Sequence, residues 1–391
     1  MNRDLHYICK SNSVNMVKRI ISEDIQTRFF KHKAIIIIGP RQTGKTTLIR
    51  ELLHNRGEPQ LWLNGDDLAV RDRLQDISTP QLATIIGKNK IVVIDEAQRI
   101  ANIGLTSKII VDNFPDIQLI ASGSSSFEIT EKINEPLTGR KWEYRLFPFS
   151  YMEMVNVNGL IAENQQLENR LIYGSYPDVI NNPGDEANVL SLLTDSFLYK
   201  DLFAYEKIKK PGILINLLKA LALQLGSEVS YNELAQIVGI DKETVDRYID
   251  ALEKSFVVFR LNAFSRNLRN ELRRSRKIFF YDNGIRNAIL SNFNPINLRT
   301  DAGALWENFF ISERMKFVHY YKLFGNSYFW RTTQQQEIDY IEDRGGRLEA
   351  YELKWNVKGK SSLPSSFMTA YPNSVFSVIT PGNYSSFLGI K

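Results

Sequence analysis

G-P-R-Q-T-G-K-T, from Gly39 to Thr46, fits the phosphate-binding pattern G-x-x-x-x-G-K-[ST] at every fixed position. An apolar, β-branched run over 34–38 comes directly before it, and a helical pattern over 47–53 follows it. A strand, a glycine-rich loop and a helix in this order form a P-loop, in which the phosphates lie at the start of the helix. The stretch therefore predicts a nucleoside triphosphate site. The alternative is a glycine-rich turn that binds nothing.

Each residue type in this loop has its own expected role. Gly39 and Gly44 allow a turn tight enough for backbone N–H groups to point at phosphate oxygens. Lys45 is expected to reach the β- and γ-phosphates, and the Thr46 hydroxyl is expected to bind Mg²⁺. The other residues of the predicted ATP-binding stretch are Pro40, Arg41, Gln42, Thr43 and Thr47.

Two carboxylates follow a second apolar run. Residues 91–94 read I-V-V-I, and Asp95 and Glu96 come next, where a parallel sheet presents its carboxyl edge. Asp95 is expected to hold Mg²⁺ through water, and Glu96 to act as general base on the attacking water. The alternative is a pair of acids that opens a solvated loop. With a P-loop upstream, the pair predicts ATP hydrolysis as well as binding.

A polar cluster follows the next apolar run, 117–121. Ser122 and Ser124 are candidates to sense the γ-phosphate, because this layout resembles the additional-strand class of ATPases. A serine and glycine cluster is also typical of a simple loop. Arg140 could bring positive charge to its own γ-phosphate or to that of a neighbouring copy, or it could be a solvated loop arginine.

The composition describes an ordinary globular chain. It has 391 residues, 43% hydrophobic and 24% charged, which allows two or three domains. The sequence contains no apolar run near the ~20 residues that span a bilayer, and the N-terminus lacks a secretory signal, so we expect a cytoplasmic protein without a membrane partner. A single cysteine and four scattered histidines argue against disulfides and structural zinc. A net charge of +5 permits nucleic-acid binding without requiring it.

The sequence divides into four regions. We expect a P-loop ATPase domain with a helical leader at 1–150, a helical lid or connector at 151–210, a winged helix-turn-helix at 211–264 and an α/β domain at 265–391. In the first region, strand-like runs alternate with helical stretches, which predicts a parallel sheet with helices on both faces. These runs are 34–38, 61–63, 91–94, 117–121 and 144–147.

The third region has three helical stretches followed by a strand, with a capping box at Ser230 to Glu233 and a turn at Gly239. The third stretch, 241–254, is net acidic, and repulsion by phosphates argues against its docking in a DNA groove. A basic run follows at Arg266, Arg269, Arg273, Arg274, Arg276 and Lys277. That run could contact phosphates, form a solvated loop or pack on the acidic helix.

The C-terminal region combines acids with a lysine on a predicted hairpin. Asp339 lies on the first strand, and Glu352 and Lys354 share one face of the second. Together with Glu307, near the start of a helix, this pattern resembles the PD-(D/E)xK restriction-endonuclease-like superfamily. The resemblance implies that Asp339 and Glu352 bind Mg²⁺, that Lys354 orients or deprotonates water, and that Glu307 assists. The alternative is a solvent-facing hairpin with ordinary charges.

The whole set of motifs resembles a family of prokaryotic ATPases that pair an AAA+ P-loop domain with a C-terminal domain of unknown function. The motifs are G-P-R-Q-T-G-K-T, I-D-E-A-Q-R, S-G-S-S-S-F, L-T-G-R, Y-G-S-Y-P and E-I-D-Y with E-L-K-W. The resemblance implies an ATPase with ATP and Mg²⁺ as cofactors, which moves a winged-helix and nuclease-like module. The alternative is a nucleotide-controlled switch with a non-catalytic protein-interaction module. DNA, a protein partner and a homo-oligomer all stay open.

Overall fold

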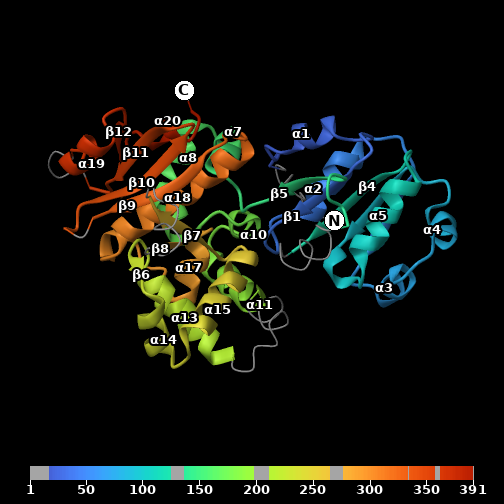
Figure 1. Ribbon diagram of the computed structural model, residues 1–391, viewed down its shortest axis with the longest axis horizontal. Coiled ribbons are helices and arrows are strands. Elements are labelled where there is room, and N and C mark those ends of the chain that lie inside the picture. The colour runs from blue at the N-terminus through green and yellow to red at the C-terminus, as the bar shows by residue number, and fades with distance from the viewer. Residues whose placement is uncertain are drawn as a thin grey trace, which may run out of the picture.

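The computed structural model describes residues 17–124, 136–197, 211–264, 276–332, 334–356 and 362–390. It contains two β-sheets, and each lies at the centre of one of the two lobes in Figure 1. The N-terminal lobe is coloured blue to teal, and the second lobe runs from green to red. The mixed α/β architecture predicted from the sequence is confirmed.

The N-terminal lobe holds a five-stranded parallel sheet in the order β2-β3-β4-β1-β5. Its strands are β1 (Ala34–Ile38), β2 (Gln60–Asn64), β3 (Ile91–Asp95), β4 (Gln118–Gly123) and β5 (Lys141–Arg145). Every residue of β1 is buried, as its continuous β-branched run predicts for the middle of a parallel sheet. Since β4 lies between β1 and β3, the residues that follow these three strands meet at one edge.

The last strand of this sheet begins earlier than predicted. The sequence pattern placed a strand at 144–147, whereas β5 pairs with β1 from Lys141, opposite Ala34, to Arg145, opposite Ile38. β5 is an edge strand, and Tyr144 is its one buried residue. Its polar composition therefore concealed its true start.

Short helices connect these strands. They are α1 (Ser22–Thr27), α2 (Lys45–His54), α3 (Leu68–Leu74), α4 (Thr79–Ile86), the 3₁₀ turn η1 (Ala97–Arg99) and α5 (Ile103–Asn113). α1 belongs to the predicted helical leader, and its Ile25 is fully buried in the core of the lobe. α2 begins directly at Lys45, so the P-loop ends at the N-terminus of this helix.

The second lobe begins with the helices predicted after residue 150. They are α7 (Tyr151–Asn158), α8 (Leu160–Gln165), α9 (Leu167–Tyr173), α10 (Pro177–Asn181) and α11 (Glu186–Phe197). The next three are α13 (Pro211–Leu223), α14 (Tyr231–Val238) and α15 (Lys242–Lys254). The Ser230 hydroxyl accepts the Glu233 N–H at the start of α14, and Gly239, with φ +73°, ends that helix.

The remaining elements are seven strands and five helical segments among the described residues. The strands are β6 (Glu228–Val229), β7 (Val258–Ala263), β8 (Arg276–Phe280), β9 (Asn326–Arg331), β10 (Glu337–Arg344), β11 (Arg347–Leu353) and β12 (Val375–Ile379). The helices are α17 (Asn283–Ile289), the 3₁₀ turn η3 (Ile296–Leu298), α18 (Ala302–Tyr320), α19 (Ser365–Ala370) and α20 (Tyr384–Phe387).

One sheet joins the two regions that the sequence had separated at residue 264. Its order is β12-β11-β10-β9-β7-β8-β6. β7, from the expected winged-helix region, pairs with β8 and also with β9, where Asn262 lies opposite Tyr328. The boundary expected at 264 therefore runs between paired strands. Local patterns indicate strands but do not show which distant strands they join.

Candidate functional site

The P-loop has the backbone geometry that its glycines allow. A Cβ atom on Gly39 would lie 2.1 Å from the carbonyl oxygen of Leu146, so the chain after β5 can approach only a glycine this closely. Gly44 adopts the left-handed region, with φ +89°, and caps the N-terminus of α2. Gln42, between them, also has a positive φ, of +59°. The first amides of α2 therefore face the space enclosed by the loop.

The Lys45 side chain folds back over this loop. Its ammonium group donates to the carbonyl oxygens of Gly39 at 2.9 Å and Pro40 at 2.7 Å. The Thr43 hydroxyl also donates to the Pro40 carbonyl, at 2.8 Å. The side chain of Lys45 is buried, and the ammonium lies within the loop that would surround the phosphates.

The Asp95 carboxylate joins the ends of two strands to the start of α2. The Thr46 hydroxyl donates to its Oδ2 at 2.7 Å, and the Ser122 hydroxyl donates to its Oδ1. This contact depends on the position of β4 between β1 and β3. A hydroxyl and a carboxylate at the N-terminus of the P-loop helix are oxygen ligands of the kind that Mg²⁺ prefers.

Glu96 is held in a conformation that few residues other than glycine adopt. Its φ is +49°, and a Cβ on Gly65 would lie 2.3 Å from its carbonyl oxygen. The side-chain amide of Gln98 donates to Glu96 Oε2 at 2.5 Å and to the Ser124 hydroxyl at 3.0 Å. Gln98 thus links the expected general base to the expected sensor. We did not predict it, although it lies within the motif I-D-E-A-Q-R.

Arg140 lies apart from this site, so among the three roles considered for it, contact with its own γ-phosphate has no support from the geometry. It directly precedes β5, and its carbonyl accepts the N–H of Ala34, at the first residue of β1. The P-loop follows the other end of β1, about 16 Å away for five residues of strand. Arg140 instead forms an ion pair with Asp112 at 2.6 Å.

A hollow of about 220 Å³ adjoins the P-loop. Its lining includes Thr47 and Leu48 from α2, Phe149 after β5, and Pro177 and Asn181 from α10. Three of these side chains are apolar and Asn181 adds an amide, and the charged residues Arg19 and Glu51 also line the hollow. We did not predict Phe149, Pro177 or Asn181, because they are far from the P-loop in sequence.

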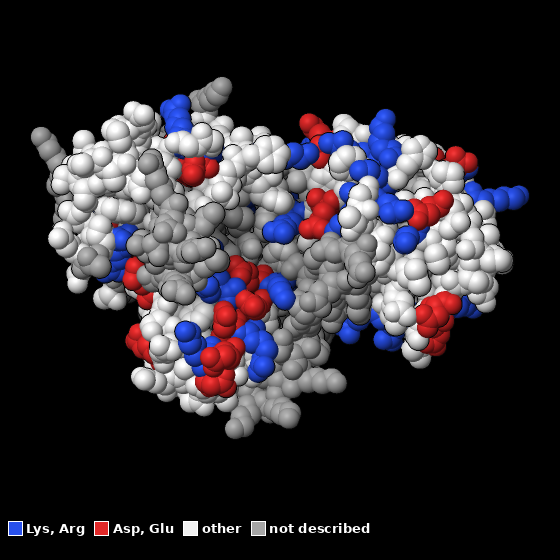
Figure 2. All heavy atoms as spheres, viewed as in Figure 1, with Lys and Arg blue, Asp and Glu red and all other residues white. Residues whose placement is uncertain are grey.

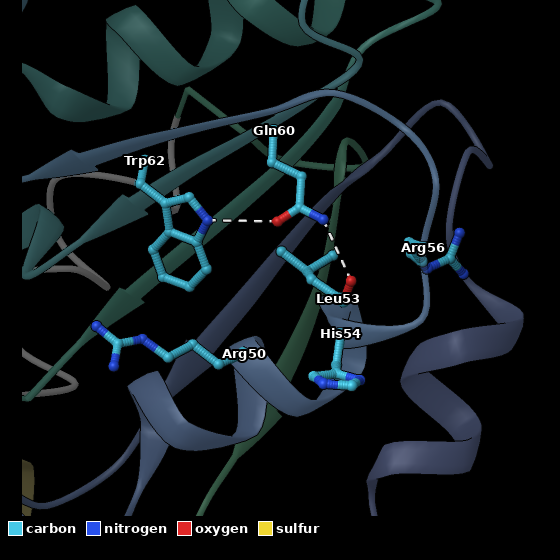
Figure 3. A pocket seen from close by; sticks show the side chains of 6 residues that line it. All are labelled: Arg50, Leu53, His54, Arg56, Gln60 and Trp62. Atoms are coloured by element: carbon cyan, nitrogen blue, oxygen red, sulfur yellow. Dashed lines mark hydrogen bonds between the residues drawn. The ribbon is translucent and has the colours of Figure 1, made fainter.

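A second hollow, of about 420 Å³, lies between α2 and β2 (Figure 3). Trp62 donates to Gln60 at 3.4 Å, and Gln60 donates to the Leu53 carbonyl at 3.2 Å. The remaining lining residues are Arg50, His54 and Arg56. All six lie outside 39–46, whereas Thr43 and Gly44 of the P-loop line the first hollow.

The acids predicted for the C-terminal site lie close to an unpredicted lysine. The ammonium group of Lys277, on β8, contacts Glu307 at 2.9 Å and Glu337 at 2.6 Å. Burial alone would lower the pKa of Lys277, but Glu307, Glu337 and Asp339 raise it above its ordinary value. Lys277 is therefore a buried ammonium ion among carboxylates.

The other predicted residues of this cluster also have partners. Asp339 accepts the Leu353 N–H at 2.7 Å, and Lys354 pairs with Glu352 at 2.6 Å. Burial raises the pKa of Asp339 to about 6, and the nearby Glu352 acts in the same direction. Burial likewise raises the pKa of Glu307 to about 7, against the opposing effect of Lys277.

The structure brings the predicted residues Glu307, Asp339, Glu352 and Lys354 together, and their metal-binding roles stay a prediction. Among the described residues, no group of three His, Cys, Asp or Glu side chains could hold a metal ion. Lys354, which belongs to the predicted pattern, pairs with Glu352, and Lys277 adds a second ammonium group beside Glu307. The sequence pattern identified residues that do lie together, but it did not show that Lys277 reaches them from β8.

The acidic side of α15 is neutralised from within the lobe. Arg260, on β7, pairs with Asp246 at 2.9 Å, with Glu253 at 2.7 Å and with Asp250. Arg276 lies 3.7 Å from Asp246. Figure 2 shows acidic and basic side chains interleaved over the lower middle of the molecule, where α15 lies in Figure 1.

These ion pairs account for one end of the predicted basic run. Arg276 packs on the acidic helix, one of the three alternatives for that run. Lys277 instead enters the carboxylate cluster. The other members, Arg266, Arg269, Arg273 and Arg274, lie outside the described residues.

The motif Y-G-S-Y-P connects α9 to α10 through a buried carboxylate. Asp282 Oδ2 accepts the Ser175 N–H at 2.7 Å, and a Cβ on Gly174 would lie 1.9 Å from Asp282 Oδ1. Gly174 also has a positive φ, of +69°. The glycine is thus required by a close approach, and Pro177 after it begins the helix that lines the hollow beside the P-loop.

Comparisons with known proteins support the P-loop ATPase part of the chain. Residues 31–155 match the family model of an AAA domain. Residues 164–295 and 302–388 match two domains of unknown function, DUF8612 and DUF4143, which name no activity. Within the parts of the chain that the structure describes, no helix is both long and apolar enough to cross a bilayer.

The relatives found by sequence similarity include proteins that are described as uncharacterized. One from Mycobacterium tuberculosis is 29% identical over 345 residues, which cover 85% of this chain and 72% of the relative. One from Methanocaldococcus jannaschii is 23% identical and covers 63% of this chain and 60% of the relative. The RuvB Holliday junction branch migration motor of Thermotoga maritima overlaps 71% of this chain and 96% of its own, with 15% identity and a TM-score of 0.31. An overlap this loose supports no further conclusion.

Proposed function

We propose that this chain binds ATP together with Mg²⁺, hydrolyses it, and uses its nucleotide state to switch the second lobe. The observation that carries the proposal is the Asp95 carboxylate, which accepts hydroxyl hydrogen bonds from Thr46 and Ser122 directly beside the P-loop. The side chains that meet there come from three segments far apart in sequence. A glycine-rich turn without a ligand would not need this convergence.

Each residue of the site has a distinct role in this proposal. The P-loop amides and Lys45 bind the phosphates, and Thr46 and Asp95 hold the metal, which neutralises charge on the β- and γ-phosphates. Glu96 accepts a proton from the attacking water. Gln98 orients Glu96 through the 2.5 Å hydrogen bond and connects it to Ser124, which lies at the end of β4.

The hollow beside the P-loop supports a nucleotide over free polyphosphate. Phe149 and Pro177 offer apolar surface for a planar base, and Asn181 offers an amide that can both donate and accept hydrogen bonds. Thr47 and Leu48 place this surface one helical turn from the phosphate-binding amides. We therefore expect the base to lie between α2 and α10.

The direct test is the release of phosphate from ATP by the purified chain, with Mg²⁺ and with Mg²⁺ removed by a chelator. We expect turnover that requires the metal, because Thr46 and Asp95 bind ATP only through it. Hydrolysis that persists in the chelator, or no hydrolysis at all, would contradict the proposal.

For the second lobe we favour a non-catalytic module that binds a protein partner over a nuclease. The arrangement that favours this reading is the Lys277 ammonium between Glu307 and Glu337, with Lys354 on Glu352. A lysine beside the carboxylates belongs to the PD-(D/E)xK pattern, so the feature that departs from it is the buried Lys277 ammonium, which pairs with Glu307 and Glu337. DNA binding gains no support from α15, because Arg260 is already paired with the acids of this helix, Asp246, Asp250 and Glu253.

A plasmid assay separates these two readings of the second lobe. With Mg²⁺ or Mn²⁺ and any nucleotide, we expect supercoiled plasmid DNA to stay intact over hours, as judged by gel electrophoresis. Cleavage by the unaltered chain that disappears in Asp339→Ala, and persists in the hairpin control Arg347→Ala, would instead establish a nuclease.

A further inference from the structure

Arg19 is a buried arginine that precedes α1 and reaches the P-loop. Its side chain is 4% exposed, and its Nη1 donates to the carbonyl oxygen of Thr43 at 2.8 Å. Its Nη2 donates to the carbonyl of Phe147 at 2.6 Å, and its Nε to Glu153 at 2.9 Å. The guanidinium group therefore binds three segments at once, in the forked geometry that lysine cannot reproduce.

The bond to Thr43 fixes the direction of one P-loop amide. The Thr43 carbonyl and the Gly44 N–H belong to one planar trans peptide, in which the C=O and N–H point to opposite sides. With its carbonyl held by Arg19, this peptide must direct the Gly44 N–H away from Arg19. Gly44 is the N-cap of α2, where N–H groups bind phosphate in P-loops.

The other partners of Arg19 belong to the second lobe or lead into it. Glu153 lies on α7 and also accepts the Ser150 N–H at 2.9 Å. Tyr320 is the last residue of α18. Its hydroxyl accepts the Phe147 N–H at 3.1 Å and lies 3.5 Å from Arg19 Nη2. Both side chains are buried, so these contacts exclude solvent.

We infer that Arg19 is a positioning residue that sets the P-loop for phosphate, and that Glu153 and Tyr320 hold it from the second lobe. The inference rests on the proposed nucleotide binding. What it adds is a set of contacts through which the second lobe reaches the P-loop. By the same contacts, phosphate bound at the P-loop favours one position of α18 relative to the N-terminal lobe, because coupling between two sites is reciprocal.

The test measures the affinity of the folded chain for inorganic tripolyphosphate and for ATP by titration calorimetry. Arg19→Lys keeps the positive charge but removes the planar guanidinium group that binds three segments at once. We expect it to weaken both affinities at least tenfold. Tyr320→Phe removes one hydroxyl, and we expect both affinities to fall about three- to tenfold. The matched controls are Arg28→Lys, in the same leader, and Tyr321→Phe, whose ring is 44% exposed.

The outcomes separate this inference from the proposed function. A purely structural role would lower the unfolding temperature and leave the affinity of the folded chain unchanged. Wild-type affinity in both Arg19→Lys and Tyr320→Phe would therefore overturn the inference while ATP binding stands. Failure of the unaltered chain to bind either ligand would overturn the proposed function, and the inference with it. A loss of affinity confined to the two variants, with both controls unchanged, supports the connection.

Discussion

Lys45→Ala is expected to lower ATP turnover by about 10²- to 10³-fold, the loss typical of removing one donor that stabilises transition-state charge. The Lys45 ammonium is the only side-chain cation that α2 places at its first turn. It now donates to the Gly39 and Pro40 carbonyls, and these same bonds would hold it against the γ-phosphate. Alanine keeps the helix and the loop backbone but removes the charge.

The measurement is steady-state phosphate release, together with the affinity for a fluorescent ATP analogue. Lys88→Ala, an exposed lysine of the same lobe, is the matched control and should hydrolyse ATP as the unaltered chain does. Unchanged hydrolysis in Lys45→Ala would sink the assignment of the P-loop. A loss of turnover in both variants would point to general damage.

The core of the N-terminal lobe could be predicted because its central strands, β1, β3 and β4, are buried on both faces. Runs such as 34–38 and 91–94 are wholly apolar, so their strands and the loops after them follow from local sequence. The loop residues Lys45, Thr46, Asp95 and Ser122 then meet because parallel strands share a carboxyl edge. The contact of Ser122 with Asp95 also depends on the strand order, because β4 lies between β1 and β3.

Arg140 shows where this logic fails. Its motif, L-T-G-R, indicates a loop. Loops occur at both ends of the strands of a parallel sheet, and the motif does not tell which end. The edge strand β5 carries Lys141, Glu143 and Arg145, and this polar pattern hid its start. Because β5 begins at Lys141, Arg140 lies at the edge opposite the P-loop.

Lys277 and Arg19 could not be placed from sequence for a different reason. Lys277 contacts Glu337 because β8 joins a sheet that also contains β10, and Arg19 contacts Phe147 across 128 positions of sequence. Both are buried cations whose partners come from distant segments. Periodicity identifies a strand or a helix, but it does not identify which charges meet across a fold.

Glu96→Gln is expected to lower the rate of ATP hydrolysis by about 10²- to 10⁴-fold while ATP still binds, because an amide cannot accept the proton of the attacking water. The substitution changes little else. The Gln98 amide can still donate to the new side-chain oxygen, and the positive φ of +49° is set by the backbone around Gly65. The affinity for ATP depends on the P-loop amides, Lys45 and Thr46, which the substitution does not touch.

A comparison of Glu96→Gln with Lys45→Ala separates the loss of proton transfer from the loss of ATP binding. If Glu96 is the general base, its glutamine variant forms a stable ATP complex, whereas Lys45→Ala should lose much of its ATP affinity. Glu58→Gln, an acid of the same lobe paired with Arg56 at 3.4 Å, is the control for the loss of one carboxylate. Equilibrium binding of ATP and single-turnover hydrolysis measure the two effects separately. Wild-type turnover in Glu96→Gln would show that another group accepts the proton. The strained backbone conformation of Glu96 would then have no catalytic role.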